Sequence, residues 1–377
     1  MKKIIVLGAG MVGRAMALDL SEEYDVHAVD IDEAALAGLN ATGKVTVERA
    51  DLRNMESLPG LIEPFDIVVS AVPGFMGYQT VEAVIRHGKN LVDISFMPED
   101  FLPLNEMAIT KGVTAIADCG VAPGLPNILA GYHYAREKIL RFEYLVGGLP
   151  VVRTLPFEYK APFSPVDVIE EYTRPARMKE RGDIVTKPAM SEPELYHFPE
   201  VGTLEGFNSD GLRSLLYTLP DIPDMKEKTL RYPGHIEKIK LLRDAGFLSQ
   251  HRVNTACGEI SPLEFTTEIL KKQWYLHPDE KEFTIMKITF DLEDAEGKRT
   301  LVYSLYDEYD TVTNTSSMAR TTGYTCTAAV RMILGGVFKE KGLLPPEKIG
   351  TQQLHLDFLL TQLADRGIIL KTNCYSD

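Results

Sequence analysis

Cysteine and long apolar runs are both scarce in this 377-residue chain, and each scarcity excludes a class of protein. The four cysteines, Cys119, Cys257, Cys326 and Cys374, are widely spaced and form no CxxC pair, so we expect reduced thiols rather than a disulfide framework. No apolar stretch approaches the roughly 20 residues that span a bilayer. The apolar run before Gly8 is also too short for a signal peptide. We therefore expect a cytoplasmic protein with no membrane partner.

Basic residues are also in deficit, because 40 lysines and arginines face 54 aspartates and glutamates, for a formal net charge of −14. This balance argues against a nucleic-acid partner. The sequence contains no HxxH, HExxH or paired Cys/His spacing, so we predict no metal site. There is no internal repeat, and the length suggests two domains.

Short β-branched runs alternate with helical segments over residues 1 to about 120. The runs include "KKIIVLG", "DVHAVD", "FDIVVSAVP", "NLVDIS" and "VTAIADCG". Continuous apolar strands separated by helices are typical of a parallel sheet that is covered on both faces. We therefore predict an α/β fold with an N-terminal Rossmann domain, a doubly wound parallel sheet.

Beyond residue 125 the pattern changes to longer runs that are closer to alternating. "FTIMKITFDLED" and "KRTLVYSLYDEY" flank "AEG" at 295–297, which predicts a hairpin turn. Helices are expected over 164–180, 209–219 and 234–246. This predicts a second α+β domain with a mostly antiparallel or mixed sheet.

The stretch "GAGMVG" places Gly8, Gly10 and Gly13 directly after the first strand and at the start of a helix. Such glycines allow a tight turn, close approach of a pyrophosphate and close helix–strand packing, and the helix N-terminus offers free N–H groups to phosphates. The pattern predicts a dinucleotide site. A Rossmann-like domain that binds another nucleotide or a methyl donor is the alternative.

The second strand ends in Asp30, 17 residues after Gly13. A carboxylate at this position accepts the ribose hydroxyls and repels a 2′-phosphate, and no arginine follows in Ile31, Asp32 and Glu33. We therefore predict NAD rather than NADP as the cofactor.

Ligands of such sheets lie at the carboxyl ends of the strands, with Asp51 expected near the adenine and residues 70–74 near the nicotinamide ribose. The predicted cofactor-binding residues are Gly8, Ala9, Gly10, Met11, Val12, Gly13, Asp30, Ile31, Asp51, Leu52, Ala71, Val72 and Pro73.

The stretch "AIADCGVAPGLPN", residues 115–127, places an acid and a thiol before a chain-bending Pro-Gly. It is open to three interpretations: a catalytic pair, half a metal site, or a domain crossing. We interpret it as the last Rossmann strand and its exit into the second domain, with Pro123 and Gly124 turning the chain. Asp118 then faces the cleft, while Cys119 is a small buried hydrophobe, since hydride transfer needs no nucleophilic thiol.

If the dinucleotide accepts hydride from an amino-acid amine, the reaction requires a group that removes an ammonium proton and a cation for the substrate carboxylate. Asp93 and Asp118 both end Rossmann strands, so either is a candidate base or amine ligand, the alternative being a loop or helix cap. In "LRYPGHIEK", Arg231 is predicted to hold a carboxylate and His235 to act as base. The alternative for Arg231 is pairing with a carboxylate of the second domain.

Several motifs together resemble the saccharopine dehydrogenase-like family, most closely its lysine 6-dehydrogenase branch. They are "GAGMVGRA", "DIVVSAVPGF", "NLVDISF", "DCGVAPGLPNILAGY", "VGGLP", "EEYTRPA", "TLRYPGHIEKIKLL" and "SSMARTTGYT", in this order over essentially the whole chain. The resemblance implies NAD-dependent oxidation of the ε-amine of lysine, with allysine and ammonia as products after hydrolysis of the imine. Allysine then cyclises.

The resemblance also implies a discontinuous nucleotide domain, residues 1–122 completed by helices from about 325–377. Residues 123–324 then form the substrate domain, through which a homo-oligomer assembles. Arg213 is a second candidate for the substrate carboxylate, because saccharopine-forming relatives have an arginine in this region. Tyr159 and Phe96 complete the predicted substrate pocket, although a tyrosine in such a segment is as often part of the core.

Two alternatives stay open on the sequence alone. A saccharopine-type reductase joins an aldehyde to an amino acid through an imine, but its larger dicarboxylate substrate demands more cations than Arg231 and Arg213. A non-catalytic NAD-binding protein would keep the fold without the reaction.

The cofactor prediction is testable through Asp30. We expect Asp30→Ala to weaken use of NAD and to relax discrimination against NADP, because the carboxylate that accepts the ribose hydroxyls and repels the phosphate is gone. Dissociation constants of both dinucleotides, measured for the variant and the wild type, check this. Unchanged discrimination would remove Asp30 from the site.

Overall fold

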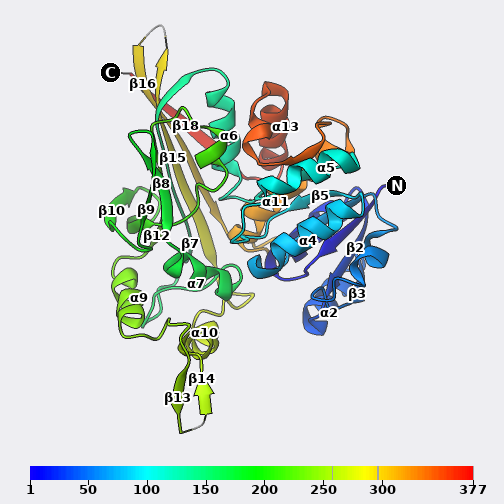
Figure 1. Cartoon of the computed structure of the whole chain (residues 1–377), viewed down its shortest axis with the longest axis horizontal. Coiled ribbons are helices and arrows are strands. Elements are labelled where there is room, and N and C mark those ends of the chain that lie inside the picture. Colours follow the sequence, from blue (N-terminus) through cyan, green and yellow to red (C-terminus); the bar gives the residue numbers. More distant parts are fainter. Residues whose placement is uncertain (257, 295–296, 377) are drawn as a thin grey trace.

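The computed structural model describes residues 1–256, 258–294 and 297–376, which form two large sheets with helices between and around them (Figure 1). Cys257 and the predicted turn residues Ala295 and Glu296 lie outside the described residues. Within that part of the chain, no helix combines the length and apolar character that a membrane crossing needs.

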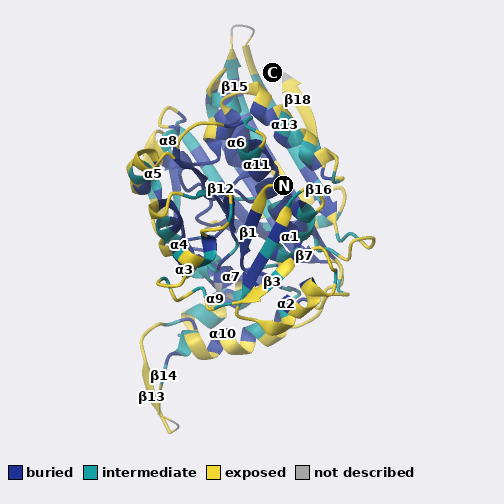
Figure 2. Cartoon of the chain, turned by 90° about the vertical axis from the view of Figure 1, so that its right-hand side faces the viewer, coloured by how far each residue is buried: buried dark blue, intermediate teal, exposed yellow. Residues whose placement is uncertain are grey.

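The first sheet is parallel throughout, in the strand order β17-β6-β5-β4-β1-β2-β3. Its strands are β1 (Lys3–Leu7), β2 (Asp25–Asp30), β3 (Thr46–Arg49), β4 (Ile67–Ser70), β5 (Asn90–Asp93), β6 (Thr114–Ile116) and β17 (Gly342–Leu344). The central strands β1 and β4 are almost wholly buried, as the dark ribbon of β1 in Figure 2 shows. The predicted parallel sheet of an α/β domain is thus confirmed.

Helices cover both faces of this sheet. They are α1 (Met11–Ser21), α2 (Glu33–Asn40), α3 (Leu58–Ile62), α4 (Gly74–Arg86), η1 (Leu102–Leu104), α5 (Asn105–Lys111), α11 (Ser317–Leu334), α12 (Glu347–Gly350) and α13 (Gln353–Ala364). Successive residues of β1 point to opposite sides: Ile4 packs with Met16 of α1, whereas Ile5 packs with Val81 of α4. This alternation explains why the strands are continuously apolar.

The second sheet is mixed, in the order β10-β11-β12-β7-β15-β16-β18, with β8 pairing β12 and β9. Its strands are β7 (Lys138–Pro150), β8 (Ala176–Glu180), β9 (Asp183–Lys187), β10 (Glu194–Phe198), β11 (Gly202–Asn208), β12 (Asp224–Arg231), β15 (Glu282–Asp294), β16 (Gly297–Glu308) and β18 (Leu370–Ser376). The β12–β7 pair is parallel, and β15 and β16 form the expected antiparallel pair. The predicted second domain with a mostly antiparallel, mixed sheet is confirmed.

Five further helices and a small hairpin accompany this sheet in the described residues. They are α6 (Leu125–Tyr134), α7 (Pro165–Thr173), α8 (Leu215–Thr218), α9 (His235–Asp244) and α10 (Pro262–Gln273), with β13 (Val253–Thr255) paired to β14 (Gly258–Ile260). The hairpin and α10 project from the rest of the molecule (Figure 1). The homo-oligomer expected from the sequence stays a prediction.

The helix expected over 164–180 was wrong in its second half. Helix α7 ends at Thr173, and Ala176–Glu180 forms β8. Pro175 is the reason, because the residue before a proline is pushed out of the helical region, and Arg174 has an extended backbone (ψ 125°). Similarly, only Leu215–Thr218 of the segment 209–219 is α-helical.

The C-terminal segment returns to both sheets. Strand β17 adds to the edge of the first sheet by parallel pairing with β6, and β18 pairs with β16 of the second. Helix α11 lies against α1, where Arg331 binds Asp19 (2.7 Å) and Glu23 (2.8 Å). The boundaries 1–122, 123–324 and 325–377 stay predictions.

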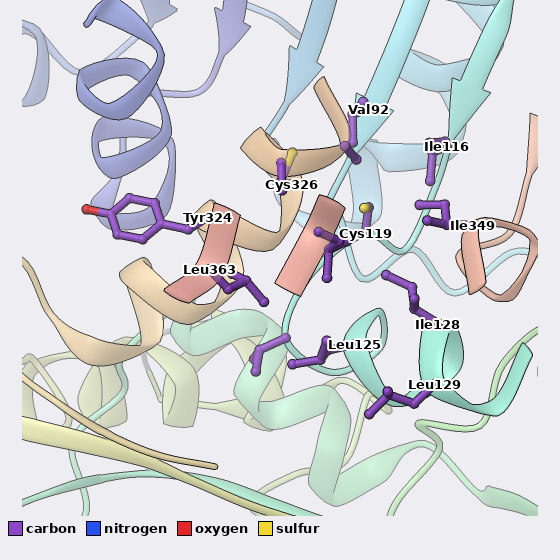
Figure 3. Packing of buried hydrophobic residues seen from close by; sticks show 14 of the residues in the cluster. Val92, Ile116, Cys119, Leu125, Ile128, Leu129, Tyr324, Cys326, Ile349 and Leu363 are labelled. Carbon is purple, nitrogen blue, oxygen red and sulfur yellow. The ribbon is translucent and has the colours of Figure 1, made fainter. Parts of the chain in front are cut away.

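The crossing between the sheets is a tight loop that only glycine permits. Gly124 has φ +139°, and a Cβ there would lie 1.9 Å from the carbonyl oxygen of Gly120. Cys119 is fully buried just before this loop, among side chains that include Ile116 and Ile128 (Figure 3). Burial strongly raises the pKa of the Cys119 thiol, which keeps it protonated and chemically quiet.

A buried ion pair connects the loop between β11 and α8 to the carboxyl end of the first sheet. The Arg213 guanidinium donates to both carboxylate oxygens of Asp118, at 2.9 and 3.2 Å, and both side chains are almost inaccessible to solvent. Both residues have a left-handed backbone, with φ 56° for Asp118 and 54° for Arg213. Such strain persists only where the surrounding structure enforces it.

We expect Arg213→Ala to lower the free energy of unfolding by about 3–5 kcal/mol, because it leaves an uncompensated carboxylate in the interior. Urea unfolding followed by circular dichroism measures the change. The control is Arg86→Ala, which removes an exposed i,i+4 pair with Glu82 and should cost about 0.3–0.5 kcal/mol. An equal decrease in the free energy of unfolding for the two variants would show that the buried pair stabilises the protein no more than the exposed pair does.

Candidate active site

A cavity of about 620 Å³ lies between the carboxyl ends of the first sheet and the strands β7 and β12 of the second. One half is lined by residues of the predicted cofactor set: Gly8, Gly10, Met11, Val12, Gly13, Asp30, Ile31, Asp51, Leu52, Ala71, Val72 and Pro73. Ala9 does not line the cavity, and its N–H donates to Asp30 Oδ2 (2.6 Å). As direct ligands of a cofactor these residues stay predictions.

The glycines of this half fit a dinucleotide. A Cβ on Gly13 would lie 1.9 Å from the carbonyl oxygen of Gly8, whereas a Cβ on Gly10 would meet no protein atom within 4 Å. Helix α1 begins after Gly10, and no side chain caps its first N–H groups. These uncapped donors lie at the cavity wall, where a pyrophosphate can accept from them.

Two carboxylates, Asp30 and Asp51, lie at the end of the cavity where the sequence predicts the adenosine part of a dinucleotide. Asp30 accepts from the N–H groups of Ala9 and Asp32, which fixes its orientation toward the cavity. Asp51 binds Arg53 in a bidentate pair (2.8 and 2.7 Å), and the hydrogen bonds from Arg53 lower the pKa of Asp51 to about 2. Sequence reasoning overlooked Arg53, which also lines the cavity two residues beyond the predicted Asp51.

The other half of the cavity, here called the inner chamber, is walled by the second domain. Its lining includes Tyr144, Gly147 and Gly148 of β7, Asp167 and Glu171 of α7, the loop residues Ser209, Asp210 and Gly211, and Glu227, Thr229 and Arg231 of β12. Residues two apart on a strand share a face, so Thr229 and Glu227 lie on the same face of β12 as Arg231. The sequence analysis missed Glu227, although the alternation of side chains along β12 would have predicted that it faces the same side as Arg231.

Arg231 lines the inner chamber, and its guanidinium is bound by three residues of the second domain. Its guanidinium donates to Glu171 and to the hydroxyl of Tyr172 (2.9 Å) and lies 4.4 Å from the ring centre of Tyr159. Arg231 therefore lines the cavity and also pairs with a carboxylate of its own domain. The pair offers a ligand both a fixed cation and a fixed anion.

Glu227 sits deep in the inner chamber with no lysine or arginine paired to it among the described residues. Its Oε2 accepts from Ser209 Oγ (2.7 Å) and from the N–H of Gly211 (3.1 Å). Ser209 Oγ is in turn 2.6 Å from Thr229 Oγ1. Burial raises the pKa of Glu227 to about 8, opposed by the Ser209 hydrogen bond and assisted by the charge of Glu171.

The three predicted catalytic residues lie behind the cavity wall rather than in its lining. Asp93 accepts from the N–H and hydroxyl of Ser95, and burial raises its pKa to about 7. Asp118 is paired with Arg213. His235 contacts the Phe157 carbonyl through Nδ1 and the Tyr172 hydroxyl through Nε2, and burial lowers its pKa to about 3. As catalytic groups they stay predictions.

The predicted substrate residues divide in the same way. Arg231 and Phe96 line the cavity, whereas Arg213 and Tyr159 do not. Tyr159 instead supports Arg231, and Arg213 lies 5.1 Å from the ring centre of Phe96. The structure thus brings all four close to the inner chamber, two in its lining and two behind that lining.

Two family models match the chain, one for each part. Residues 4–116 match the saccharopine dehydrogenase NADP binding domain, and residues 120–368 match the saccharopine dehydrogenase C-terminal domain. The chain belongs to the saccharopine dehydrogenase family. It is accordingly an NAD(P)-dependent dehydrogenase of that family, with a nucleotide-binding first domain.

Two relatives are distant in sequence but match over more than nine-tenths of the chain. The chain is 24% identical to a saccharopine dehydrogenase (NADP(+), L-glutamate-forming) of Schizosaccharomyces pombe, over 92% of this chain and 94% of that protein. It is 23% identical to the protein of the same name from Saccharomyces cerevisiae, over 98% of both. A solved structure of apo saccharopine dehydrogenase (L-Glu forming) from S. cerevisiae superimposes with a TM-score of 0.81, at 21% identity and full coverage of both chains, which shows the shared fold.

The two glycines after β1 should separate fold from cofactor binding. Gly10→Ala places its methyl group in the cavity and should raise the dissociation constant of the dinucleotide roughly tenfold or more while leaving stability unchanged. Gly13→Ala collides with backbone and should lower the free energy of unfolding by about 1–3 kcal/mol. Dinucleotide titration and urea unfolding of both variants check this, and a destabilised Gly10→Ala with intact binding would contradict it.

Proposed function

We propose that this protein oxidises the ε-amine of L-lysine with NAD, giving allysine and ammonia. The observation that carries the proposal is the charge of the inner chamber. Its lining holds the carboxylates of Asp167, Glu171, Asp210 and Glu227, but one guanidinium, that of Arg231, among the described residues. An excess of anionic groups favours a substrate with a net positive charge.

Not all of these carboxylates are available to a ligand. Asp210 is bound in a bidentate pair by Arg177 (2.9 and 2.8 Å), and Asp167 accepts from the N–H of Gly74 at the start of α4 (3.2 Å). Glu171 and Glu227 remain, the first paired with Arg231 and the second without a lysine or arginine partner in the described part of the chain. This leaves one zwitterionic subsite, at Arg231 and Glu171, and a second subsite at Glu227 that is anionic when this carboxyl group is deprotonated.

Lysine is complementary to these two subsites. Its α-carboxylate matches Arg231, its α-ammonium matches Glu171, and its terminal ammonium matches the deprotonated form of Glu227. Phe163 and Val146, also in the lining, offer apolar surface to the methylene chain. Lysine carries a net charge of +1, in keeping with the excess of carboxylates.

The cofactor assignment rests on Asp30. Its carboxylate is held by two backbone N–H groups at the cavity wall, where it would accept the ribose hydroxyls and repel a 2′-phosphate. Arg53, which lines the same half of the cavity, is engaged by Asp51. Both features support NAD over NADP.

The bound dinucleotide would supply the hydride acceptor for the carbon that carries the amine. The residues of the chain would hold lysine by its α-groups, orient the terminal amine, and exclude bulk water until hydride has left. Water then adds to the iminium carbon, and ammonia leaves to give the aldehyde.

Oxidation of saccharopine is the second candidate, because the named relatives are saccharopine dehydrogenases. That substrate joins a glutamate arm to lysine and therefore brings two additional carboxylates. The inner chamber offers Arg231 for them, and Glu171 and Glu227 would oppose a dianionic arm. The charge argument therefore ranks lysine first.

A spectrophotometric assay of the purified protein tests the proposal. With NAD we expect absorbance of reduced nicotinamide to rise with L-lysine, and kcat/KM to fall roughly tenfold or more for cadaverine and for 6-aminohexanoate, which lack one α-group each. Saccharopine and NADP serve as the comparison arms. NADH formation with saccharopine alone would show that the second candidate is the right one.

A further inference from the structure

Glu227 and Asp167 differ from Glu171 and Asp210, the other acidic residues of the inner chamber, in having only neutral hydrogen-bond donors. Asp167 accepts from the N–H of Gly74 in the first domain, whereas the donors to Glu227 belong to its own domain. Asp210 is neutralised by Arg177, and Glu171 is paired with Arg231. Ser209 Oγ and the Gly211 N–H bind one oxygen of Glu227, Oε2. Such a carboxyl group can exchange a proton with a ligand without breaking an ion pair.

The backbone holds Glu227 in place. Gly211 passes so close that a Cβ on it would lie 2.7 Å from Glu227 Cγ and 2.6 Å from the hydroxyl of Tyr144. That hydroxyl donates to the Gly211 carbonyl (2.7 Å), which fixes the loop from the side of β7. The carboxyl group is therefore confined between β12 and the 209–211 loop, with its face toward the cavity.

Ser209 and Thr229 extend this site along the cavity wall. The contacts Glu227 Oε2–Ser209 Oγ (2.7 Å) and Ser209 Oγ–Thr229 Oγ1 (2.6 Å) form a continuous chain of hydroxyl groups. Both hydroxyl residues line the same cavity as the carboxyl group. A proton on Glu227 can thus leave through two hydroxyls without crossing apolar surface.

We propose that Glu227 is the catalytic base that accepts a proton from the terminal ammonium of the substrate, and that Ser209 positions it. This inference rests on the proposed function for the identity of the amine. The ammonium R–CH₂–NH₃⁺ gives one proton to the carboxylate, leaving R–CH₂–NH₂ and a neutral Glu227. The nitrogen lone pair then forms the C=N bond as hydride leaves the carbon for the oxidised nicotinamide, giving R–CH=NH₂⁺.

The charged and titratable groups around Glu227 set the expected pH dependence. They are Glu171 on α7, Asp210 in the adjoining loop, Tyr144 on β7 and Arg231 on its own strand. Burial and the two neighbouring carboxylates raise the pKa of Glu227 to about 8. Because the base acts when deprotonated, kcat/KM should rise with pH and level off above about 8.

The test compares pH profiles of kcat/KM for the full-length wild type, Glu227→Gln and Ser209→Ala with NAD and L-lysine. Glu227→Gln should lower kcat by ~100-fold or more and abolish the rising limb, with the dissociation constant of NAD unchanged. Ser209→Ala should keep the limb but move it to higher pH, since the Ser209 hydrogen bond lowers the pKa of Glu227. If Glu227 and Ser209 had a purely structural role, both variants would lose activity, but kcat/KM would rise with pH over the same range as in the wild type.

Glu347→Gln is the matched control. Glu347 is equally buried and is also bound by hydroxyl groups, those of Ser214 and Thr218, but it lies outside the cavity lining. Its variant should keep the wild-type profile. An intact rising limb in Glu227→Gln would overturn the inference.

Assays with lysine and with saccharopine distinguish a failure of this inference from a failure of the proposed function. If the wild type oxidises saccharopine but not lysine, the proposed function is wrong, and the same variants decide the role of Glu227 with saccharopine, whose secondary ammonium also loses a proton. If the wild type oxidises neither amine, both statements are overturned. Turnover of lysine with an unaffected Glu227→Gln overturns the inference alone.

Discussion

The Asp118–Arg213 ion pair is the interaction on which the geometry of the cavity depends. It joins the carboxyl end of the first sheet to Arg213, in the loop between β11 and α8. The pair lies inside the protein, where an unpaired charge would be costly. The other end of that loop is tied to Glu227 through Ser209 and Gly211. The loop is thus fixed to a different sheet at each end, and the inner chamber takes its shape from this arrangement.

Charges around the cavity fall into two kinds. Those behind the lining are matched or satisfied by fixed donors, as with Asp118 by Arg213 and Asp93 by Ser95. In the lining, Asp210 and Glu171 are each paired with an arginine, whereas Glu227 has no lysine or arginine partner among the described residues. The low polarity of the interior makes such a group expensive unless a ligand compensates it. The paired groups stabilise the fold, and Glu227, which is bound by neutral donors, is the group that we propose for the chemistry.

Prediction from the sequence worked where a local pattern has one structural meaning. Continuous apolar strands after glycine-rich turns specify a parallel sheet, and the first sheet and the cavity-lining glycines followed from them. It worked less well where a polar residue could equally face the cavity or lie buried behind the cavity wall. His235 and Arg231 are four residues apart in one motif, yet Arg231 faces the cavity while His235 lies behind Tyr172. Pro175 gave a usable signal for the end of α7 that the helical pattern outweighed.

The sequence by itself determined the two-sheet architecture, the glycine-rich turn and the position of Asp30 at the end of β2, because these depend on contacts within a few residues or on strand periodicity. Only the tertiary structure decided which acids are free. Asp118 and Glu227 look alike along the chain, but their protonation and availability depend on partners that are distant in sequence: Arg213 for one, the 209–211 loop for the other. Burial and pairing are properties of the assembled fold, and they assign the roles.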